Sequence, residues 1–223
     1  MGCILKGGGG LYPRMRVGAV LLAAGEAKRM NGINKLAVEM QGVPLLRRAL
    51  ISLSGAGVDE VVVVLGHNAQ LLAPLVQDFP VTIVHNHRYR KGQMTSVRAG
   101  LAELPGPFDA VLICVADQPL LNAQDIQSLI GAFKKREKGY AVVPRVKGER
   151  GNPIIIDWSA REEILEGGAN LGCRQLIDRH PDRVATFESE NDHYIVDLDT
   201  MEDMSVLESR LGLKFKLPAT VPG

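Results

Sequence analysis

Short apolar runs rich in valine, isoleucine and leucine alternate along the chain with stretches in which apolar residues recur every three or four positions. Because the runs are continuous rather than alternately apolar and polar, they are typical of strands covered on both faces in a parallel sheet. The intervening stretches have the period of amphipathic helices. We expect strands at residues 17–22, 60–65, 81–84, 110–115 and 140–143, and helices at residues 44–55, 69–77, 94–104 and 122–135.

This strand–helix–strand order predicts right-handed βαβ units, and hence an α/β, three-layer Rossmann-like fold with a mostly parallel central sheet. The rhythm changes at residues 145–153, where turn-forming residues predict a small hairpin excursion. Beyond it we expect a short helix opened by a capping box at Ser159 and Glu162, a helix at 171–178, strands at 184–187 and 193–196, and a last helix from Thr200 to about residue 211, with Asp203 in its cap.

The length of 223 residues suits one large domain. We expect a flexible N-terminal extension at residues 1–15, which is rich in glycine, and a single domain at residues 16–212. The last stretch, residues 213–223, contains two prolines and is expected to be a poorly ordered tail.

The overall charge limits the classes of partner. The formal net charge is +1, so no bulk field favours nucleic acid or an anionic membrane, and we expect neither as a partner. No apolar run reaches the length of about 18 residues that a transmembrane helix requires. The three cysteines, Cys3, Cys114 and Cys173, fit no zinc or redox spacing, so a reducing cytoplasm is the simplest location.

A cationic loop follows the first expected strand. Small residues at Ala23, Ala24 and Gly25 let a backbone approach a ligand closely, and Arg29 and Lys35 follow within ten residues of Gly25. Cations this close together need either free solvent or an anion. The pattern therefore predicts a polyphosphate site, with a solvated surface loop as the alternative.

Carboxylates follow two later strands. Asp117 comes directly after the strand expected at 110–115, and Asp197 and Asp199 follow the one expected at 193–196. Magnesium in proteins is typically held by one or two carboxylates together with water and substrate phosphates. We interpret Asp117 as a magnesium ligand and one or both of the others as its partner. The alternatives are that Asp117 caps a turn and that Asp199 caps the last helix.

Two further polar stretches are candidates for substrate contacts. Gln93 and Ser96 stand at the start of a helix, where they could read a base edge or a phosphate, or simply cap the helix. The stretch from Gly148 to Pro153, which includes Arg150 and Asn152, resembles a tight loop near a second substrate and equally resembles a plain surface hairpin.

Six motifs in this order resemble those of the MobA-like nucleotidyltransferases, and the molybdenum cofactor cytidylyltransferase branch with its related molybdenum hydroxylase accessory proteins is the most similar. The motifs are L-A-A-G-x-x-x-R-M-x-x-x-x-K at residues 22–35, G-x-P-L-L at 42–46, G-Q-x-x-S at 92–96, A-D-x-P at 116–119, R-G-N-P at 150–153 and D-x-D-T-x-E-D at 197–203. The resemblance covers about residues 17–210.

The resemblance implies a GT-A-like fold and a magnesium-dependent enzyme that transfers CMP from CTP to a phosphate-bearing acceptor and releases pyrophosphate. It implies catalytic roles for Arg29, Lys35 and Asp117, and magnesium ligation by Asp117 and Asp199. The implied nucleotide site consists of Leu22, Ala23, Ala24, Gly25, Arg29, Lys35, Gly66, Gln93, Ser96 and Asp117, and the implied acceptor site of Arg150, Asn152 and Arg174. The implied acceptor is of the molybdopterin type, and a molybdenum hydroxylase is the implied protein partner.

The chain departs from the family pattern at Asn31, Ala116 and Asn170, which replace two glycines and an aspartate. The L-A-A-G variant favours CTP, whereas L-A-G-G is more typical of members that use GTP. Other functions on the same fold stay open, namely transfer to a sugar phosphate and non-enzymatic delivery of a finished cofactor. A nicotinamide-dependent oxidoreductase is more distant, because neither a dinucleotide fingerprint nor a P-loop occurs.

Overall fold

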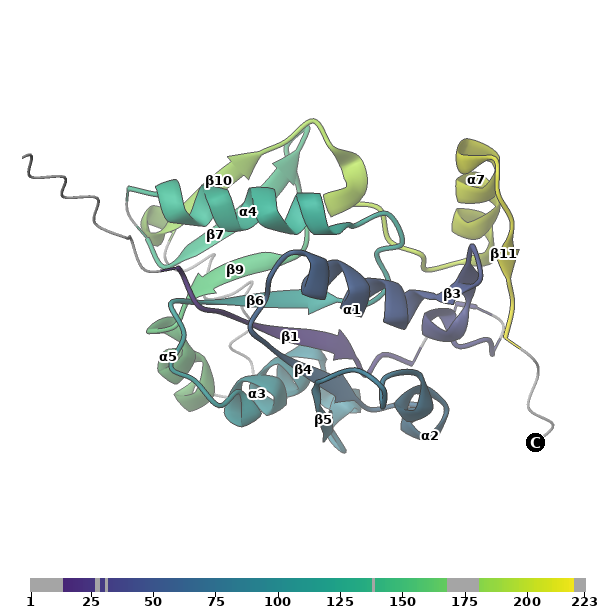
Figure 1. Cartoon of the computed structure of the whole chain (residues 1–223), viewed down its shortest axis with the longest axis horizontal. Helices are drawn as coiled ribbons and strands as arrows, with labels where there is room; N and C mark the ends of the chain where they lie inside the picture. Colours follow the sequence, from purple (N-terminus) through teal and green to yellow (C-terminus); the bar gives the residue numbers. More distant parts are fainter. Residues whose placement is uncertain (1–13, 27–28, 31, 138, 168–180, 219–223) are drawn as a thin grey trace, which may run out of the picture.

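The computed structural model describes residues 14–26, 29–30, 32–137, 139–167 and 181–218. Its core is a mixed, mostly parallel sheet between two layers of helices (Figure 1), which confirms the expected fold class. The helices expected at 44–55, 94–104 and 122–135 are present with ends that differ by one residue. The helix expected at 171–178 lies outside the described residues.

The central sheet has the strand order β10-β7-β9-β6-β1-β4-β5, with β8 paired to β7. The parallel pairs are β1 with β4 and β6, β4 with β5, and β7 with β10, whereas β9 runs antiparallel to β6 and β7. The strands are β1 (Val17–Ala23), β4 (Glu60–Leu65), β5 (Thr82–His85), β6 (Ala110–Val115), β7 (Ala141–Val146), β8 (Glu149–Arg150), β9 (Ile154–Asp157) and β10 (Val184–Glu188).

Helices cover both faces of the sheet because apolar side chains alternate to either side of its buried strands. Helices α1 (Leu45–Gly55) and α4 (Ala123–Lys135) lie on one face, and α3 (Gln93–Glu103) and α5 (Ala160–Glu166) lie on the other (Figure 1). All seven residues of β1 are buried. This strand is therefore the centre of the molecule, and its carboxyl end is fixed on both sides.

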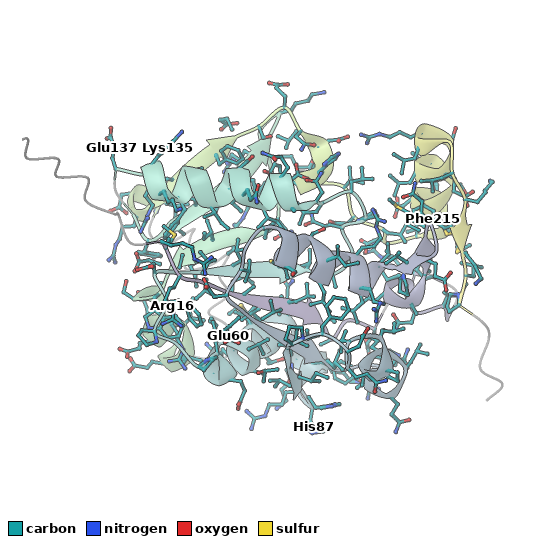
Figure 2. All side chains as sticks on the ribbon, viewed as in Figure 1. Arg16, Glu60, His87, Lys135, Glu137 and Phe215 are labelled. Atoms are coloured by element: carbon teal, nitrogen blue, oxygen red, sulfur yellow. The ribbon has the colours of Figure 1, made fainter. Side chains whose placement is uncertain are left out.

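A smaller antiparallel sheet, β11-β2-β3, stands beyond the carboxyl end of β1 (Figure 1). It contains β2 (Glu39–Met40), β3 (Val43–Pro44) and β11 (Phe215–Lys216), and α7 (Met201–Leu211) packs with it. In Figure 2, Arg16 at the amino end of β1 and Phe215 of β11 lie on opposite sides of the molecule. The remaining helical turns are η1 (Lys35–Ala37), α2 (Ala69–Leu72), η2 (Ala73–Leu75), η3 (Tyr89–Lys91), η4 (Pro181–Arg183) and η5 (Asp192–Tyr194).

The small sheet and α7 pack around their own hydrophobic cluster, which we call the third cluster. It contains Met30, Val38, Met40, Leu45, Leu120, Leu198, Met204, Leu207 and Phe215. Met30 belongs to the cationic loop and Leu198 separates the two late aspartates, and both are fully buried. One patch of core therefore fixes the backbone beside Arg29 and beside Asp199.

Local sequence signals were correct where a cap or a turn decides the conformation. Asn122 and Asp125 form a capping box at α4, and Thr200 and Asp203 form another at α7. The hairpin excursion is also present, because β7 and β8 are joined through Lys147 and Gly148, which have φ angles of 52° and 84°. Positive φ at both central residues is typical of a two-residue hairpin turn.

Three local predictions were wrong. Residues 193–196 do not form a strand, because the segment turns through η5 and buries Tyr194. Ser159 does not cap α5, since its hydroxyl donates to Asp157 instead. The helix expected at 69–77 is divided into α2 and η2, with Pro74 near the break. The poorly ordered tail stays a prediction, and the described part of residues 213–223 includes β11, which pairs with β2.

Arg14 contacts the domain, and Cys114 is buried inside it. Arg14, which falls in the expected flexible extension, donates to the carbonyl of Gly57 and pairs with Asp59. Cys114 lies in β6 and is buried, and burial raises the pKa of its thiol.

Within the described residues, no helix is long and apolar enough to cross a membrane.

Two glycines give a matched test of the packing between α3 and the sheet. A methyl group at Gly100 of α3 would collide with Val20 of β1 and Val64 of β4, whereas a methyl group at Gly131 of α4 would contact nothing within 4 Å. We expect Gly100→Ala to lower the free energy of unfolding by about 1–3 kcal/mol through overpacking. Gly131→Ala should raise it by up to about 1 kcal/mol, because alanine favours helix over glycine.

Urea unfolding followed by circular dichroism measures both changes. Equal effects of the two substitutions would contradict the close approach of α3 to β1 and β4.

Candidate active site

The sheet brings the cationic loop and Asp117 to one edge. Strands β1 and β6 are parallel neighbours with Leu22 opposite Val115, so the residues that follow them emerge side by side. The amide of Ala116 donates to the carbonyl of Leu22 at 3.2 Å, which continues the pairing past the end of β6. Carboxyl ends of parallel strands are where ligands bind in open α/β sheets.

Asp199 reaches the same edge from the C-terminal part of the chain. The amide of Leu198 donates to the carbonyl of Asp117 at 2.9 Å, and the Leu198 side chain is buried in the third cluster. Because neighbouring residues of an extended segment point in opposite directions, burial of Leu198 turns Asp199 outward. The side chain of Asp203 accepts from the amide of Asp199 at 3.0 Å and fixes this segment against α7.

Four side chains of opposite charge meet at this edge. The Lys35 ammonium donates to Asp117 Oδ2 and to Asp199 Oδ1, each at 2.6 Å, and Arg29 Nη2 lies 2.5 Å from Asp199 Oδ2. The Lys35 side chain is 12% exposed, whereas that of Arg29 is 68% exposed. Asn34 supports Lys35 by capping η1, since its side chain accepts from the amide of Leu36.

These contacts set the protonation of the group. Burial on its own would lower the pKa of Lys35, but the charge of Asp117 and hydrogen bonds to both carboxylates raise it above its usual 10.5. Burial acts in the opposite sense on Asp199, and the hydrogen bond and charge of Lys35 bring its pKa below its usual value. Lys35 is therefore a cation and Asp199 an anion at neutral pH.

A third carboxylate stands beside them. Loss of water around the Asp197 carboxyl, together with the charges of Asp117 and Asp199, raises its pKa to about 7. The residue as a whole is exposed, so these neighbouring charges act on a group that still has access to solvent.

The charged group lines a cleft of about 360 Å³. The described residues around it are Leu22, Ala23, Gly25, Glu26, Arg29, Asn34, Lys35, Leu36, Asp117 and Asp199. Seven predicted site residues therefore surround one cavity. Lys28 and Asn31 of the same loop lie outside the described residues.

A second hollow of about 240 Å³ adjoins the first, with Leu22, Gly25 and Asp117 common to both. Its other described lining residues are Ala24, Tyr89, Gln93, Ser96 and Val115. Ser96 is buried and accepts from Asn86 Nδ2 at 2.9 Å, which leaves its own hydroxyl hydrogen available. An aromatic ring and neutral polar groups thus stand next to the charged cleft.

Close packing requires glycine at position 66, which the sequence alone does not reveal. A Cβ there would lie 2.7 Å from Ala24 Cβ and 3.0 Å from Tyr89 Cβ, and the adjacent amide of His67 donates to the carbonyl of Ala24. Gly66 lines a third, more open cavity of about 1200 Å³, along with His85, Asn86 and Tyr89. The structure thus puts Gly66 behind the loop rather than in the lining of the first two hollows.

The donor set fits a hard divalent ion. Asp117 Oδ1 is buried and has no hydrogen-bond partner among the described residues, and Asp117 Oδ2 and Asp199 Oδ1 share the Lys35 ammonium. Carboxylate oxygens are the ligands that magnesium and manganese prefer. Within the described residues no three acidic, histidine or cysteine groups form a ready cage, so water and substrate oxygens would have to complete the coordination.

The expected acceptor residues stand apart from both hollows. Arg150 lies in β8 and Asn152 in the turn before β9, and neither belongs to the lining described above. Arg174 lies outside the described residues. The Asn152 amide donates to the carbonyl of Tyr194 at 2.8 Å, and Gln118 Nε2 donates to the same carbonyl at 2.8 Å.

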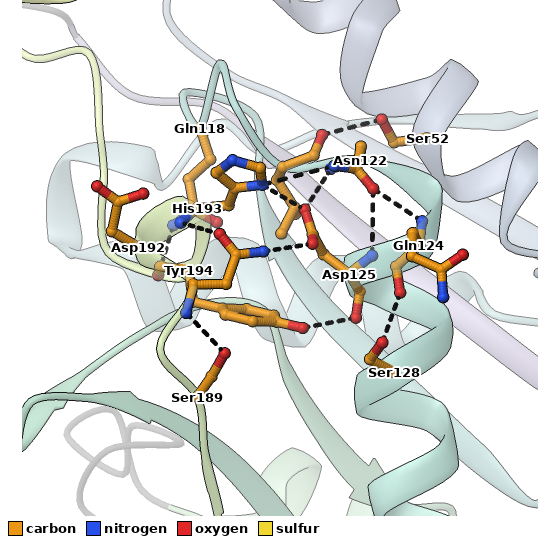
Figure 3. A network of polar contacts seen from close by, with 12 residues as sticks. Ser52, Gln118, Asn122, Gln124, Asp125, Ser128, Ser189, Asp192, His193 and Tyr194 are labelled. Carbon is orange, nitrogen blue, oxygen red and sulfur yellow. Dashed lines mark hydrogen bonds and ion pairs between the residues drawn. The ribbon is translucent and has the colours of Figure 1, made fainter.

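Sequence reasoning missed the polar network around Tyr194 that Figure 3 shows. The buried carboxylate of Asp125 accepts from Asn191 Nδ2 at 2.6 Å and lies 2.8 Å from His193 Nδ1, and the Tyr194 hydroxyl donates to the Asp125 carbonyl at 2.7 Å. The network joins α4, the residue after Asp117 and the segment that leads to Asp199. The signal in the sequence was Asp125 itself, which is expected in the first turn of a helix capped by Asn122.

The two capping boxes test the strength of this network. Asp125→Ala removes a helix cap and also leaves Asn191 and His193 without their acceptor, whereas Asp203→Ala removes a cap at the surface of α7. We expect Asp203→Ala to lower the free energy of unfolding by about 1 kcal/mol. Asp125→Ala should lower it by about 1–3 kcal/mol more, because the partly buried Asn191 and His193 lose their partner.

Denaturant unfolding of the two variants gives the comparison. Losses of the same size would mean that the Asn191 and His193 contacts add nothing to stability.

Comparison with known proteins agrees with this geometry. Residues 19–184 match the MobA-like NTP transferase domain. A nicotine blue oxidoreductase of Paenarthrobacter nicotinovorans is 30% identical over 84% of this chain and 94% of its own length. A probable molybdenum cofactor guanylyltransferase of Methanosarcina acetivorans is 26% identical over 85% of this chain and 77% of its own length.

The fold is also found among solved structures. The crystal structure of Rv0371c from Mycobacterium tuberculosis superposes with a TM-score of 0.73 at 21% identity, over 87% of this chain and 98% of that one. A complex of that protein with manganese gives a TM-score of 0.68. Because the family model matches most of its length, the chain belongs to the MobA-like NTP transferase family and is a nucleotidyltransferase.

Proposed function

We propose that this protein transfers CMP from CTP, as a magnesium complex, to a terminal phosphate of a molybdopterin-type acceptor, with release of pyrophosphate. The observation that carries the proposal is the convergence of Arg29, Lys35, Asp117 and Asp199 on one cleft at the carboxyl edge of the sheet. Cations for a triphosphate and carboxylates for its metal stand there within hydrogen-bond distance of one another.

The triphosphate would lie along the loop that follows β1. Ala23 and Gly25 line the cleft with small side chains or none, so their backbone is open to a phosphate, and Arg29 and Lys35 supply two positive charges. Arginine can bind two phosphate oxygens with its planar fork, whereas lysine acts as a mobile point charge. These residues neutralise the β- and γ-phosphates and so stabilise the departing pyrophosphate.

Asp117 and Asp199 would hold the magnesium ion with the carboxylate oxygens that Lys35 contacts in the free protein. The ion, when bound, neutralises charge on the α-phosphate and orients the phosphates for displacement. The capping contact from Asp203 and the bond from the Leu198 amide to Asp117 keep the two carboxylates at a fixed separation. Rigid placement of this kind is the main contribution a protein makes to phosphoryl chemistry.

The second hollow would bind the base and ribose. Gln93 and Ser96 offer donors and acceptors, Tyr89 offers an aromatic edge, and Ala24 leaves the floor open. The L-A-A-G sequence at residues 22–25 supports CTP over GTP as the nucleotide donor.

The chemical step needs no strong base from the protein. An oxygen of the acceptor phosphate forms a bond to the α-phosphorus, while the bond from that phosphorus to the oxygen bridging to the β-phosphate breaks and pyrophosphate leaves with the electron pair. A phosphate nucleophile is already ionised near neutral pH. The charged cleft therefore has only to position the reactants and offset charge.

The acceptor would approach from the side of β8 and β9. Arg150, Asn152 and Arg174 are proposed to bind its phosphate, and Arg174 belongs to the part of the chain that the structure does not describe. The carbonyl of Tyr194 links the Asn152 loop to Gln118, next to Asp117, which supports a fixed distance between acceptor and metal. A molybdenum hydroxylase is the proposed recipient of the product.

Incubation with magnesium, each of the four nucleoside triphosphates and either molybdopterin or a panel of sugar phosphates tests the assignment. Pyrophosphate release with CTP and molybdopterin is the expected result. Release only with a sugar phosphate would show another transferase of the same fold, and tight cofactor binding without release would show a delivery protein.

One substitution separates an enzyme from a carrier. Asp117→Asn keeps the size of the side chain but removes a metal ligand, and we expect turnover to fall on the order of 10²–10³-fold. Asp78→Asn is the matched control, because Asp78 pairs with Arg47 at the surface and should leave turnover unchanged. Pyrophosphate release by both variants measures the difference, and equal rates would contradict the role of Asp117.

The Paenarthrobacter nicotinovorans relative is named as an oxidoreductase, so an oxidoreductase reaction is the second activity to test. Oxidation of NADH or NADPH in the presence of a quinone-like dye acceptor, followed by absorbance, would reveal it. The sequence contains no dinucleotide fingerprint. We therefore expect an oxidation rate no higher than that of a protein-free control.

A further inference from the structure

One buried ammonium holds together the two carboxylates of the cleft. Lys35 Nζ lies 2.6 Å from Asp117 Oδ2 and 2.6 Å from Asp199 Oδ1, and the three side chains are 12%, 22% and 32% exposed. Arg29 reaches only Asp199, from a far more exposed position. Lys35 is therefore the cation that bridges the carboxylates in the free protein.

The bridging ammonium and a bridging metal would compete for the same oxygens. A magnesium ion binds carboxylate oxygens at about 2.0–2.1 Å, and ammonium hydrogens already occupy the space between Asp117 Oδ2 and Asp199 Oδ1. The two cations would also repel each other at such a separation. A metal that bridges the carboxylates thus requires Lys35 to move.

We propose that Lys35 makes the site select a metal–triphosphate complex over either component alone. In the free protein the ammonium occupies the position between the carboxylates, and it moves onto the phosphates when metal and triphosphate arrive together. The proposal rests on the proposed function, since it assumes the same two ligands in the same cleft.

Each ligand alone leaves charges unpaired. A metal ion by itself displaces Lys35, whose ammonium is then nearly buried with no partner, and such a charge is costly. A triphosphate by itself attracts Lys35 away, so that Asp117 faces the phosphates without the ammonium and Asp199 keeps only Arg29, which the phosphates attract as well. Both ligands together give each carboxylate a metal and each protein cation a phosphate.

The side chain of Lys35 is free to make this exchange. Lysine has four rotatable carbon–carbon bonds and a charge that does not depend on a fixed plane, so a shift of the ammonium by a few ångströms requires no movement of the backbone. Its backbone is fixed by η1 and by the Asn34 cap. The neighbours of Lys35 in η1, Leu36 and Ala37, are buried, which keeps the root of the side chain in place.

Lys35→Met tests the proposal with binding measurements that require no turnover. Methionine is unbranched and uncharged, so the carboxylates lose their bridging cation and become available. Manganese titration in the absence of nucleotide, followed by electron paramagnetic resonance of the free ion, should show at least a tenfold lower dissociation constant for the variant than for the wild type. CTP titration in EDTA should show at least a tenfold weaker affinity.

Lys214→Met is the matched control. Lys214 also pairs with a carboxylate, that of Glu208 at 2.7 Å, but it is exposed and lies between α7 and β11. This variant should bind manganese and CTP like the wild type. Lys35→Gln, with a neutral side chain that can still donate, should show the same two shifts as Lys35→Met and serves if the methionine variant fails to fold by circular dichroism.

The proposal is overturned if both Lys35 variants bind manganese no more tightly than the wild type. Such a result would mean that Lys35 does not compete with the metal. The outcome is independent of the proposed reaction: absence of pyrophosphate release with every nucleotide would refute the transfer, while opposite shifts in metal and nucleotide affinity would still support the exchange.

Discussion

The ion pairs of Lys35 hold together two regions of the chain that the sheet alone would leave apart. Asp117 follows a central strand, whereas Asp199 arrives 164 residues after Lys35, from a segment that leads into α7. The carboxylates of Asp117 and Asp199 would repel each other in the cleft if no cation stood between them. The ammonium makes their approach favourable, and the rest of the cleft keeps its shape because of it.

Hydrophobic packing beneath the cleft also fixes the positions of its charged side chains. Met30 and Leu198 are fully buried in the third cluster, and each is the immediate neighbour of a charged residue of the cleft. An apolar side chain that points into the core forces the next residue outward, so hydrophobic burial decides where Arg29 and Asp199 point. The polar network at Asp125 and Tyr194 supports the same segment from the opposite side.

Much of this could be predicted from the residues, because the signals are local. Continuous apolar runs identified β1, β4 and β6, and caps at Asn122 and Thr200 placed the starts of α4 and α7. Parallel neighbours then required that the residues after β1 and β6 meet at one edge, which brought Arg29, Lys35 and Asp117 together before any coordinates were known.

The errors concern residues whose conformation depends on distant contacts. The segment around Tyr194 alternates like a strand, but its ring enters the core and its carbonyl accepts from Gln118 and Asn152, neither of which is near in sequence. Ser159 has the residues of a cap, yet the carboxylate of Asp157 takes its hydroxyl. The nucleotide contact of Gly66 stays a prediction, and the structure adds a packing reason for glycine there, since Ala24 and Tyr89 leave no room for a Cβ.

The separate third cluster affects how the protein would lose its ability to bind ligands on heating or proteolysis. Its members come from the cationic loop, from the segment of Asp199 and from α7 with β11, while the large sheet is stabilised by separate clusters. Regions of a protein can open independently when their cores are separate. Detachment of α7 would release the anchors of Arg29 and Asp199 simultaneously, so the ability to hold a metal and a triphosphate would vanish while the sheet still gave the spectrum of a folded protein.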